Sequence, residues 1–159
     1  MKLALLLLGS FLLGACATPH GPFEAFYENG QVNERGVYQH GKRDGVWEWY
    51  YENGQLEKRG SLDREKEDGP WEYFYEDGTL SERVQWKKGQ QDGRRTQFHA
   101  NGQLKEQSTW RDGQPVGLHE AYHANGQLAK TGYIDAGKKS GPWKYFDKDG
   151  RLINTKAYK

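Results

Sequence analysis

The chain has 159 residues and a formal charge of +1, and aromatic residues supply 14% of it. Aliphatic side chains are few, which excludes a conventional large hydrophobic core. Acidic and basic residues alternate along the chain without the one-sided basic stripe that binding to a phosphate backbone requires, so no nucleic-acid partner is predicted.

The N-terminal residues predict export from the cytoplasm. Lys2 precedes an apolar run that begins at Leu3 and ends in small residues, which is the pattern of a secretory signal peptide. The run has 13 residues up to Ala15, too few for a helix that needs about 20 to cross a bilayer. Residues 1–15 are therefore expected to be removed, and the loss of Lys2 leaves a formal charge of zero.

Cys16, the only cysteine, directly follows the predicted cleavage point. The sequence Leu13-Gly14-Ala15-Cys16 resembles the lipobox of bacterial lipoproteins, in which the cysteine is acylated and becomes the first residue. The resemblance implies a permanent membrane anchor at Cys16, because two or more acyl chains hold a protein stably on a bilayer. The alternative is a general signal peptide followed by a free thiol, or by a cysteine that pairs between chains.

Residues 16–20 are predicted to be a lipidated N-terminus and a short tether. The four residues between Cys16 and Gly21 reach at most about 14 Å when fully extended, so the repeats are expected to lie close to the membrane. Among lipoproteins of Gram-negative bacteria, an aspartate after the cysteine commonly signals retention in the inner membrane. Ala17 occupies that place here, so the resemblance points to the cell envelope, and to the outer membrane if the host has one.

A tandem repeat occupies residues 21–159. Six glycines lie 24 residues apart, and an Asn-Gly or Asp-Gly dipeptide follows each at one fixed offset; they are Gly21, Gly45, Gly69, Gly93, Gly117 and Gly141. Such a period is typical of units that bury their apolar faces by stacking on their neighbours. The sequence predicts five full units and a partial sixth, numbered below from the glycine at position 1, and makes an enzyme an unfavoured interpretation.

The Asn-Gly or Asp-Gly at positions 9 and 10 predicts a β-hairpin in each unit. A two-residue turn would place the residues at positions 6 and 12 on opposite faces, whereas a three-residue loop pairs them, as Phe74 with Leu80. We therefore expect the three-residue loop. A second, polar turn leads to the next glycine, so the units are predicted to form an all-β, elongated antiparallel meander or solenoid with almost no helix.

Large apolar residues recur at three positions of every unit, and positions 6 and 12 are expected to form the core seam. No polar residue intrudes at any of the three positions. The residues are Phe26, Tyr50, Phe74, Phe98, Tyr122 and Phe146 at position 6, Val32, Leu56, Leu80, Leu104, Leu128 and Leu152 at position 12, and Tyr38, Leu62, Trp86, Trp110, Ile134 and Tyr158 at position 18.

The segment from Gly45-Val46-Trp47 through Asn53-Gly54-Gln55-Leu56, and its counterpart from Gly69-Pro70-Trp71 to Leu80, resemble MORN-variant repeats. The resemblance covers residues 21–159 and implies a repeat fold with no inherited catalytic residue. Bacterial proteins of this kind are often grouped with the YwqK-like antitoxins, which are thought to neutralise a toxin by binding it. Other MORN proteins act as membrane-associated scaffolds. Two functions stay open: an antitoxin or immunity protein with one protein partner, and an envelope scaffold that contacts lipid, glycan or several weak partners.

Rings at positions 3, 5 and 7 of the second and third units predict a partner-binding patch. With a three-residue loop, position 3 is expected to face the arginine at position 15 in a cation–π contact. Tryptophan, tyrosine and arginine are the residues enriched in interaction hot spots. The candidate residues are Trp47, Trp49, Tyr51, Arg59, Trp71, Tyr73, Tyr75 and Arg83. The alternative is that these side chains only cover the outer face of the sheet.

The remaining reactive side chains predict no further site. The serines occupy different positions in their units, and no nucleophile has an evident base. His99 and His123 are equivalent residues two strands apart, which places them roughly 10 Å from each other, too far to share a metal ion. The sequence thus predicts no catalytic residue, no metal and no cofactor.

Overall fold

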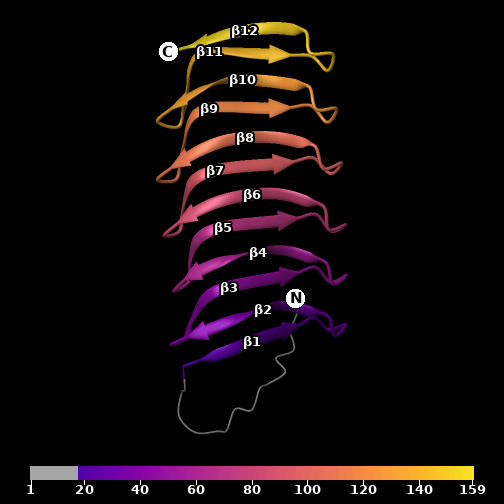
Figure 1. The fold of residues 1–159 in the computed structure, drawn as a ribbon, viewed down its shortest axis with the longest axis vertical. Coiled ribbons are helices and arrows are strands. Elements are labelled where there is room, and N and C mark those ends of the chain that lie inside the picture. Colours follow the sequence, from indigo (N-terminus) through magenta and orange to yellow (C-terminus); the bar gives the residue numbers. More distant parts are fainter. Residues whose placement is uncertain (1–17) are drawn as a thin grey trace.

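The computed structural model describes residues 18–159, so the predicted signal peptide and Cys16 lie outside the described residues. In this part of the chain, twelve antiparallel strands form one sheet in which each strand pairs with its neighbours in the chain (Figure 1). The odd-numbered strands are β1 Gly21–Phe26, β3 Lys42–Tyr50, β5 Lys66–Phe74, β7 Gln90–Phe98, β9 Gln114–Tyr122 and β11 Lys138–Phe146. The even-numbered strands are β2 Val32–Gln39, β4 Leu56–Asp63, β6 Leu80–Lys87, β8 Leu104–Arg111, β10 Leu128–Asp135 and β12 Leu152–Tyr158. The predicted all-β meander is confirmed.

Each unit contributes one hairpin, which the Asn-Gly or Asp-Gly dipeptide closes as predicted. In the second unit, Tyr51 N donates to Gln55 O at 2.8 Å, and Gly54 N donates to Tyr51 O at 2.9 Å. Gly54 has a φ of 82°, a left-handed conformation that glycine adopts without strain. The residues at positions 6 and 12 then face each other, as in the Phe74–Leu80 pair. The three-residue loop is confirmed.

A β-bulge next to this loop changes the register of every hairpin. In the second unit the pair Tyr50–Leu56 is followed by Trp49–Lys58, so the residue at position 13 is skipped. One extra residue on one strand moves every later pair by one place. Position 3 therefore faces position 16 instead of position 15.

Because of this bulge, the predicted contacts between the rings at position 3 and the arginines at position 15 are wrong. Those contacts were Phe23 with Arg35, Trp47 with Arg59, and Trp71 with Arg83. The observed partners are Phe23 with Gly36, Trp47 with Gly60, and Trp71 with Val84. Two of these partners are glycines, and the ring that lies on each glycine belongs to the following unit, Trp47 on Gly36 and Trp71 on Gly60.

The buried side chains among the described residues lie on one face of the sheet, at positions 3, 5, 16 and 18. They are Ala25, Trp47, Leu62, Trp71, Val84, Ser108, His119, Ala121 and Trp143. We term this the aromatic face, and the opposite side, with positions 2, 4, 6, 12, 15 and 17, the charged face. Positions 6 and 12 are only half-buried, and Leu152 is 55% exposed, so the predicted core seam is wrong. Tyr38, Leu62 and Trp86, at position 18, pack with the rings of the aromatic face.

The turns that link consecutive units are also joined along the sheet. Glu65 N donates to Arg43 O at 3.0 Å, and the same contact recurs in later units. Pro19 O accepts a hydrogen bond from Gly41 N at 2.9 Å, so the residues before β1 take the place of a preceding turn. The described chain is therefore held against the sheet from its first residues onward.

Candidate functional site

The structure separates the predicted partner-binding residues into three places. Trp47, Trp49, Trp71 and Tyr73 lie on the aromatic face, Tyr51 and Tyr75 begin the three-residue turns, and Arg59 and Arg83 lie on the charged face. The arginines belong to the charged face because Arg59 pairs directly with Glu48 and Glu72, which alternate with the tryptophans along their strands. The predicted residues do not form one surface.

Each tryptophan at position 3 lies against a glycine of the preceding strand. A Cβ added to Gly60 would overlap the indole of Trp71, and the Trp71 Nε1 donates to Ser61 O at 3.1 Å. Trp47 lies on Gly36 and Trp143 on Gly132 in the same way, and their Nε1 atoms donate to the carbonyls that follow those glycines. We term this arrangement the Gly–Trp lock.

The lock was missed by the sequence reasoning, although the repeat carries a signal for it. Where position 16 is not glycine, the next unit has no tryptophan at position 3: Val84 precedes Arg95, and Ser108 precedes His119. Arg95 instead contacts Glu82 at 2.5 Å, and His119 Nε2 contacts Glu106 at 3.2 Å. The two positions therefore change together within one chain.

The rings of the aromatic face cover one another along the sheet. Ring centroids are 6.0 Å apart for Trp47 and Trp49, 5.5 Å for Trp49 and Trp71, and 6.2 Å for Trp71 and Tyr73. Such pairs each contribute about 0.5–1.5 kcal/mol beyond the area that they bury. Trp47 is 0% exposed and Trp71 4%, so these two indoles offer almost no surface to a partner.

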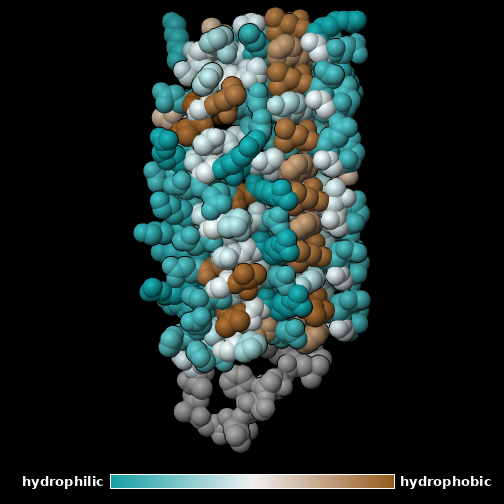
Figure 2. Space-filling view, in the orientation of Figure 1, coloured by the Kyte–Doolittle hydropathy of each residue, from teal (hydrophilic) through white to brown (hydrophobic). Residues whose placement is uncertain are grey.

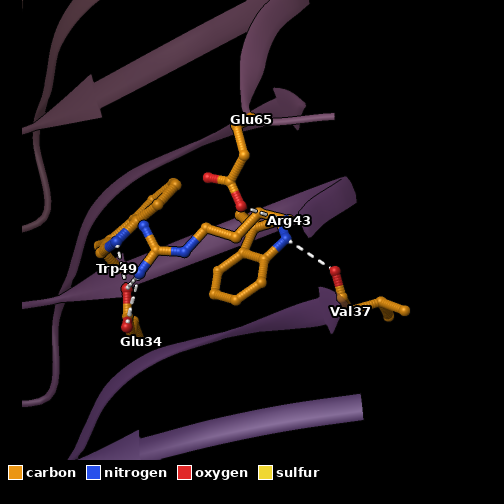
Figure 3. Close-up of polar contacts among 6 residues, drawn as sticks. Glu34, Val37, Arg43, Trp49 and Glu65 are labelled. Atoms are coloured by element: carbon orange, nitrogen blue, oxygen red, sulfur yellow. Dashed lines mark hydrogen bonds and ion pairs between the residues drawn. The ribbon is translucent and has the colours of Figure 1, made fainter. Parts of the chain in front are cut away.

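Two charged residues, Arg43 and Glu34, lie against the first rings of the aromatic face (Figure 3). Arg43 Nη2 donates to both carboxylate oxygens of Glu34 at 2.9 Å, and Trp49 Nε1 donates to Glu34 Oε2 at 2.7 Å. The Arg43 guanidinium lies 4.6 Å from the ring centroid of Trp47. Charge-assisted bonds of this kind are stronger than neutral ones. Sequence reasoning missed both residues because it assigned the segment before Gly45 to a polar turn, whereas Arg43 lies in β3 together with Trp47.

Position 7 joins one unit to the next. Tyr51 OH donates to Phe74 O at 2.7 Å, and Tyr75 OH donates to Phe98 O at 2.8 Å. Burial raises the pKa of Tyr51, so the hydroxyl stays protonated to a higher pH than an exposed tyrosine. His99 Nε2 occupies the same place 2.9 Å from Tyr122 O, so histidine replaces tyrosine without loss of the contact. Tyr51 and Tyr75, which were predicted to bind a partner, thus have a structural role in joining neighbouring units.

Five segments of this sheet match one family model, described as the MORN repeat variant: residues 19–40, 43–63, 67–88, 91–112 and 115–135. Together they cover more than half of the chain. The chain belongs to the MORN-variant repeat family. A comparison with the curated proteins found no match. The matched model describes a structural repeat, and the match itself identifies no catalytic residue.

The charged face of the MORN-variant sheet carries a ladder of ion pairs. Glu72 accepts from Arg59 at 2.7 Å and from Arg83 at 2.9 Å, and Glu48 accepts from Arg35 at 2.6 Å. Burial alone would raise the pKa of Glu72, but the two guanidinium groups outweigh it and hold that pKa below its ordinary value. The predicted residues Arg59 and Arg83 therefore belong to this ladder.

An apolar column runs beside the ladder, along the side with the three-residue turns (Figure 2). It follows the paired residues at positions 6 and 12, such as Tyr50 with Leu56 and Phe98 with Leu104. Exposed apolar residues near the middle of the strands on the same face include Val46, at 61%, and Leu118, at 45%. No second layer of the described chain covers this face.

Two further features of residues 18–159 concern metal binding and membrane crossing. That part of the chain has no three His, Cys, Asp or Glu side chains close enough to hold a metal ion. It also has no helix of the length and apolarity needed to cross a membrane. The described chain therefore has two broad sheet faces of different chemistry, one of packed rings and one of ion pairs with exposed apolar side chains.

Proposed function

We propose that this MORN-variant protein binds a protein partner through its charged face, without catalysis, while acylated Cys16 anchors it in the cell envelope. The observation that carries the proposal is the difference between the two faces. On the aromatic face, ring contacts and the Arg43–Glu34 pair use the side chains internally. On the charged face, apolar side chains remain in contact with solvent.

The composition of the charged face supports protein binding. The half-buried column at positions 6 and 12 lies beside arginine and glutamate side chains, which gives an apolar centre with charged neighbours (Figure 2). Contiguous exposed apolar surface on a soluble domain marks an interaction site, and arginine and tyrosine are frequent in hot spots. Tyr50 and Arg83 supply these residue types here.

The partner class follows from the family resemblance. The resemblance to YwqK-like antitoxins favours a toxin as the partner and an immunity role for this chain. A scaffold that contacts several envelope components is the second candidate, and the regularity of the apolar column favours it, because each unit presents a similar surface to a further copy of a partner. One tight complex distinguishes the first function from the second.

The partner-binding test is affinity capture from detergent-solubilised envelopes with three full-length proteins. They are the wild type, a charged-face variant with Val46→Lys and Leu118→Lys, and an aromatic-face variant with Trp49→Ala and Tyr73→Ala. All are first compared by far-UV circular dichroism. We expect one partner that the charged-face variant loses. Loss from the folded aromatic-face variant alone would return the site to the rings, and the absence of a specific partner would contradict partner binding.

Anchoring is tested separately with Cys16→Ser. The described chain begins close against the sheet, since Pro19 contacts Gly41, so an acyl anchor at Cys16 would hold the first hairpin near the bilayer. We expect the wild type to incorporate labelled fatty acid and to sediment with membranes, and Cys16→Ser to lose both properties. Unchanged labelling and sedimentation of the variant would contradict a lipid anchor at this residue.

A further inference from the structure

The charged face changes at the fourth unit, where two residues depart from the repeat. Position 4 is glutamate in the first three units and Thr96 in the fourth. Position 2 is proline or valine in the first three units and Arg94 in the fourth. One negative charge is therefore lost and one positive charge gained at the same place.

This change alters the direction of one ladder arginine. Arg35 and Arg59 each bind the glutamate of the following unit, Glu48 at 2.6 Å and Glu72 at 2.7 Å. Arg83 has Thr96 in that place, so its Nε instead donates to Glu72 of its own unit at 2.9 Å. Glu72 then serves two arginines, and its single charge does not balance both.

A groove lies where the ladder is interrupted. Its volume is about 560 Å³, and its lining includes Pro70, Arg83, Gln85, Arg94, Thr96 and Phe98. Arg94 also contacts Gln107, a neutral side chain, so this second guanidinium has no carboxylate partner among its hydrogen bonds in the described chain. The groove combines two cationic side chains, the carboxylate of Glu72, a hydroxyl, an amide and an apolar wall, so its cationic groups outnumber its one carboxylate.

We propose that this groove binds a carboxylate side chain of the partner protein, an aspartate or glutamate next to an apolar residue. The planar guanidinium group matches a carboxylate with two parallel hydrogen bonds, and Arg83 keeps its terminal nitrogens for such a contact because only Nε is used for Glu72. Phe98 and Pro70 supply the wall for the apolar neighbour. The proposal rests on the proposed function and names the chemistry of the partner at this groove.

The first test uses nuclear magnetic resonance of the arginine Nε–H groups in the full chain. The probe is an acetylated and amidated Glu-Leu-Glu peptide, with the Gln-Leu-Gln peptide and acetate as comparisons. We expect saturable shifts at Arg83 and Arg94, and at least fivefold weaker binding of the glutamine peptide. Acetate at equal concentration should produce smaller shifts, because it lacks the apolar neighbour.

Matched variants locate the site. Arg59→Gln is the control, because Arg59 has the same repeat position and the same Glu72 partner as Arg83 but does not line the groove. Arg83→Gln with Arg94→Gln should weaken peptide binding at least tenfold, and Arg59→Gln less than twofold. Thr96→Glu restores the repeat glutamate and should abolish binding with the fold intact. Equal weakening by Arg59→Gln, or unchanged binding by Thr96→Glu, would overturn the assignment.

Capture from envelopes separates this proposal from the proposed function. If wild type and Thr96→Glu retain the same partner equally, the groove is not a partner contact, although partner binding stands. If the wild type captures no partner, the proposed function fails independently of the peptide result. Acetate that shifts Arg83 and Arg94 as strongly as the peptide, with partner capture unaffected by Thr96→Glu, would reduce the groove to a site for small carboxylates and overturn the proposal.

Discussion

At the scale of single residues, the Gly–Trp lock explains why a sheet without a second layer has a buried core. Gly60 brings backbone and indole into contact, so Trp71 is shielded by the sheet on one side and by neighbouring rings on the other. Dense packing of this kind leaves no room for an added methyl group. The fold therefore depends on the contact between glycine, the smallest residue, and tryptophan, the largest.

Substitution of Gly60 tests the lock. Gly60→Ala is expected to lower the free energy of unfolding by about 1–3 kcal/mol, because the new Cβ overlaps the Trp71 ring and forces it to move. Gly60 does not have a positive φ, so backbone strain does not supply this loss. Urea unfolding gives the value. Ser61→Ala is the control, since only the Ser61 carbonyl bonds Trp71, and an unaffected Gly60→Ala protein would contradict the lock.

Glu72 gives a prediction for the dependence of stability on pH. Its pKa is lowered in the folded chain, so its ion pairs stabilise the fold above the ordinary value of 4.5, and this contribution is lost as the pH falls through the lower folded value. The pairs lie near the surface, which limits the contribution to about 1 kcal/mol. We expect Glu72→Gln to lower the urea midpoint at pH 7 and to match the wild type at pH 2. An equal difference at both pH values would contradict this assignment.

At the scale of the hairpin, position 7 provides a direct comparison of two natural solutions. Tyr75→Phe removes the hydroxyl that bonds Phe98 O and is expected to cost about 0.5–1.5 kcal/mol. Tyr75→His keeps a donor in the place where His99 has one, so a smaller loss is expected. Urea unfolding of the two variants measures the difference. A histidine variant no more stable than the phenylalanine variant would show that the hydrogen bond is not what position 7 supplies.

Within the hairpin, the sequence predicted the loop correctly but the pairing of the two strands beyond it incorrectly. The three-residue loop was predictable because the conformation at Gly54 and the pairing of positions 6 and 12 are local. The bulge at position 13 has no comparable local signal, and it moved every later pair by one place. This shift separated the tryptophans from Arg59 and Arg83, so the candidate site was divided between two faces. The sequence does show that glycine at position 16 accompanies tryptophan at position 3 of the next unit, and this pattern could have predicted the Gly–Trp lock.

At the scale of the whole molecule, the last unit lacks two features that join the other units. Position 7 is Asp147 where earlier units have tyrosine or histidine, and position 16 is Lys156 where three earlier units have glycine. β12 is exposed along almost all of its length. A lysine on an edge strand opposes pairing with another strand, so we expect Lys156 to disfavour pairing at this edge of the described sheet.

Giving the last unit the residues that earlier units have at positions 7 and 16 should make this sheet edge associate with a second molecule. Asp147→Tyr with Lys156→Gly is expected to raise the average mass relative to the wild type as protein concentration increases. Sedimentation velocity measures this mass. Lys159→Gly removes the same positive charge outside the strand and serves as the control. An unchanged mass for the double variant would contradict a protective role for the last unit.

The aromatic face stabilises the sheet, and we propose that the charged face binds the partner. Hydroxyl-radical footprinting of the full chain, alone and in its captured complex, tests both halves in one measurement. We predict that the complex protects Val46, Phe98 and Leu118, and leaves the reactivity of Trp49 and Tyr73 unchanged. Protection of Trp49 and Tyr73 with no change at Val46, Phe98 and Leu118 would contradict the account and assign the partner to the aromatic face.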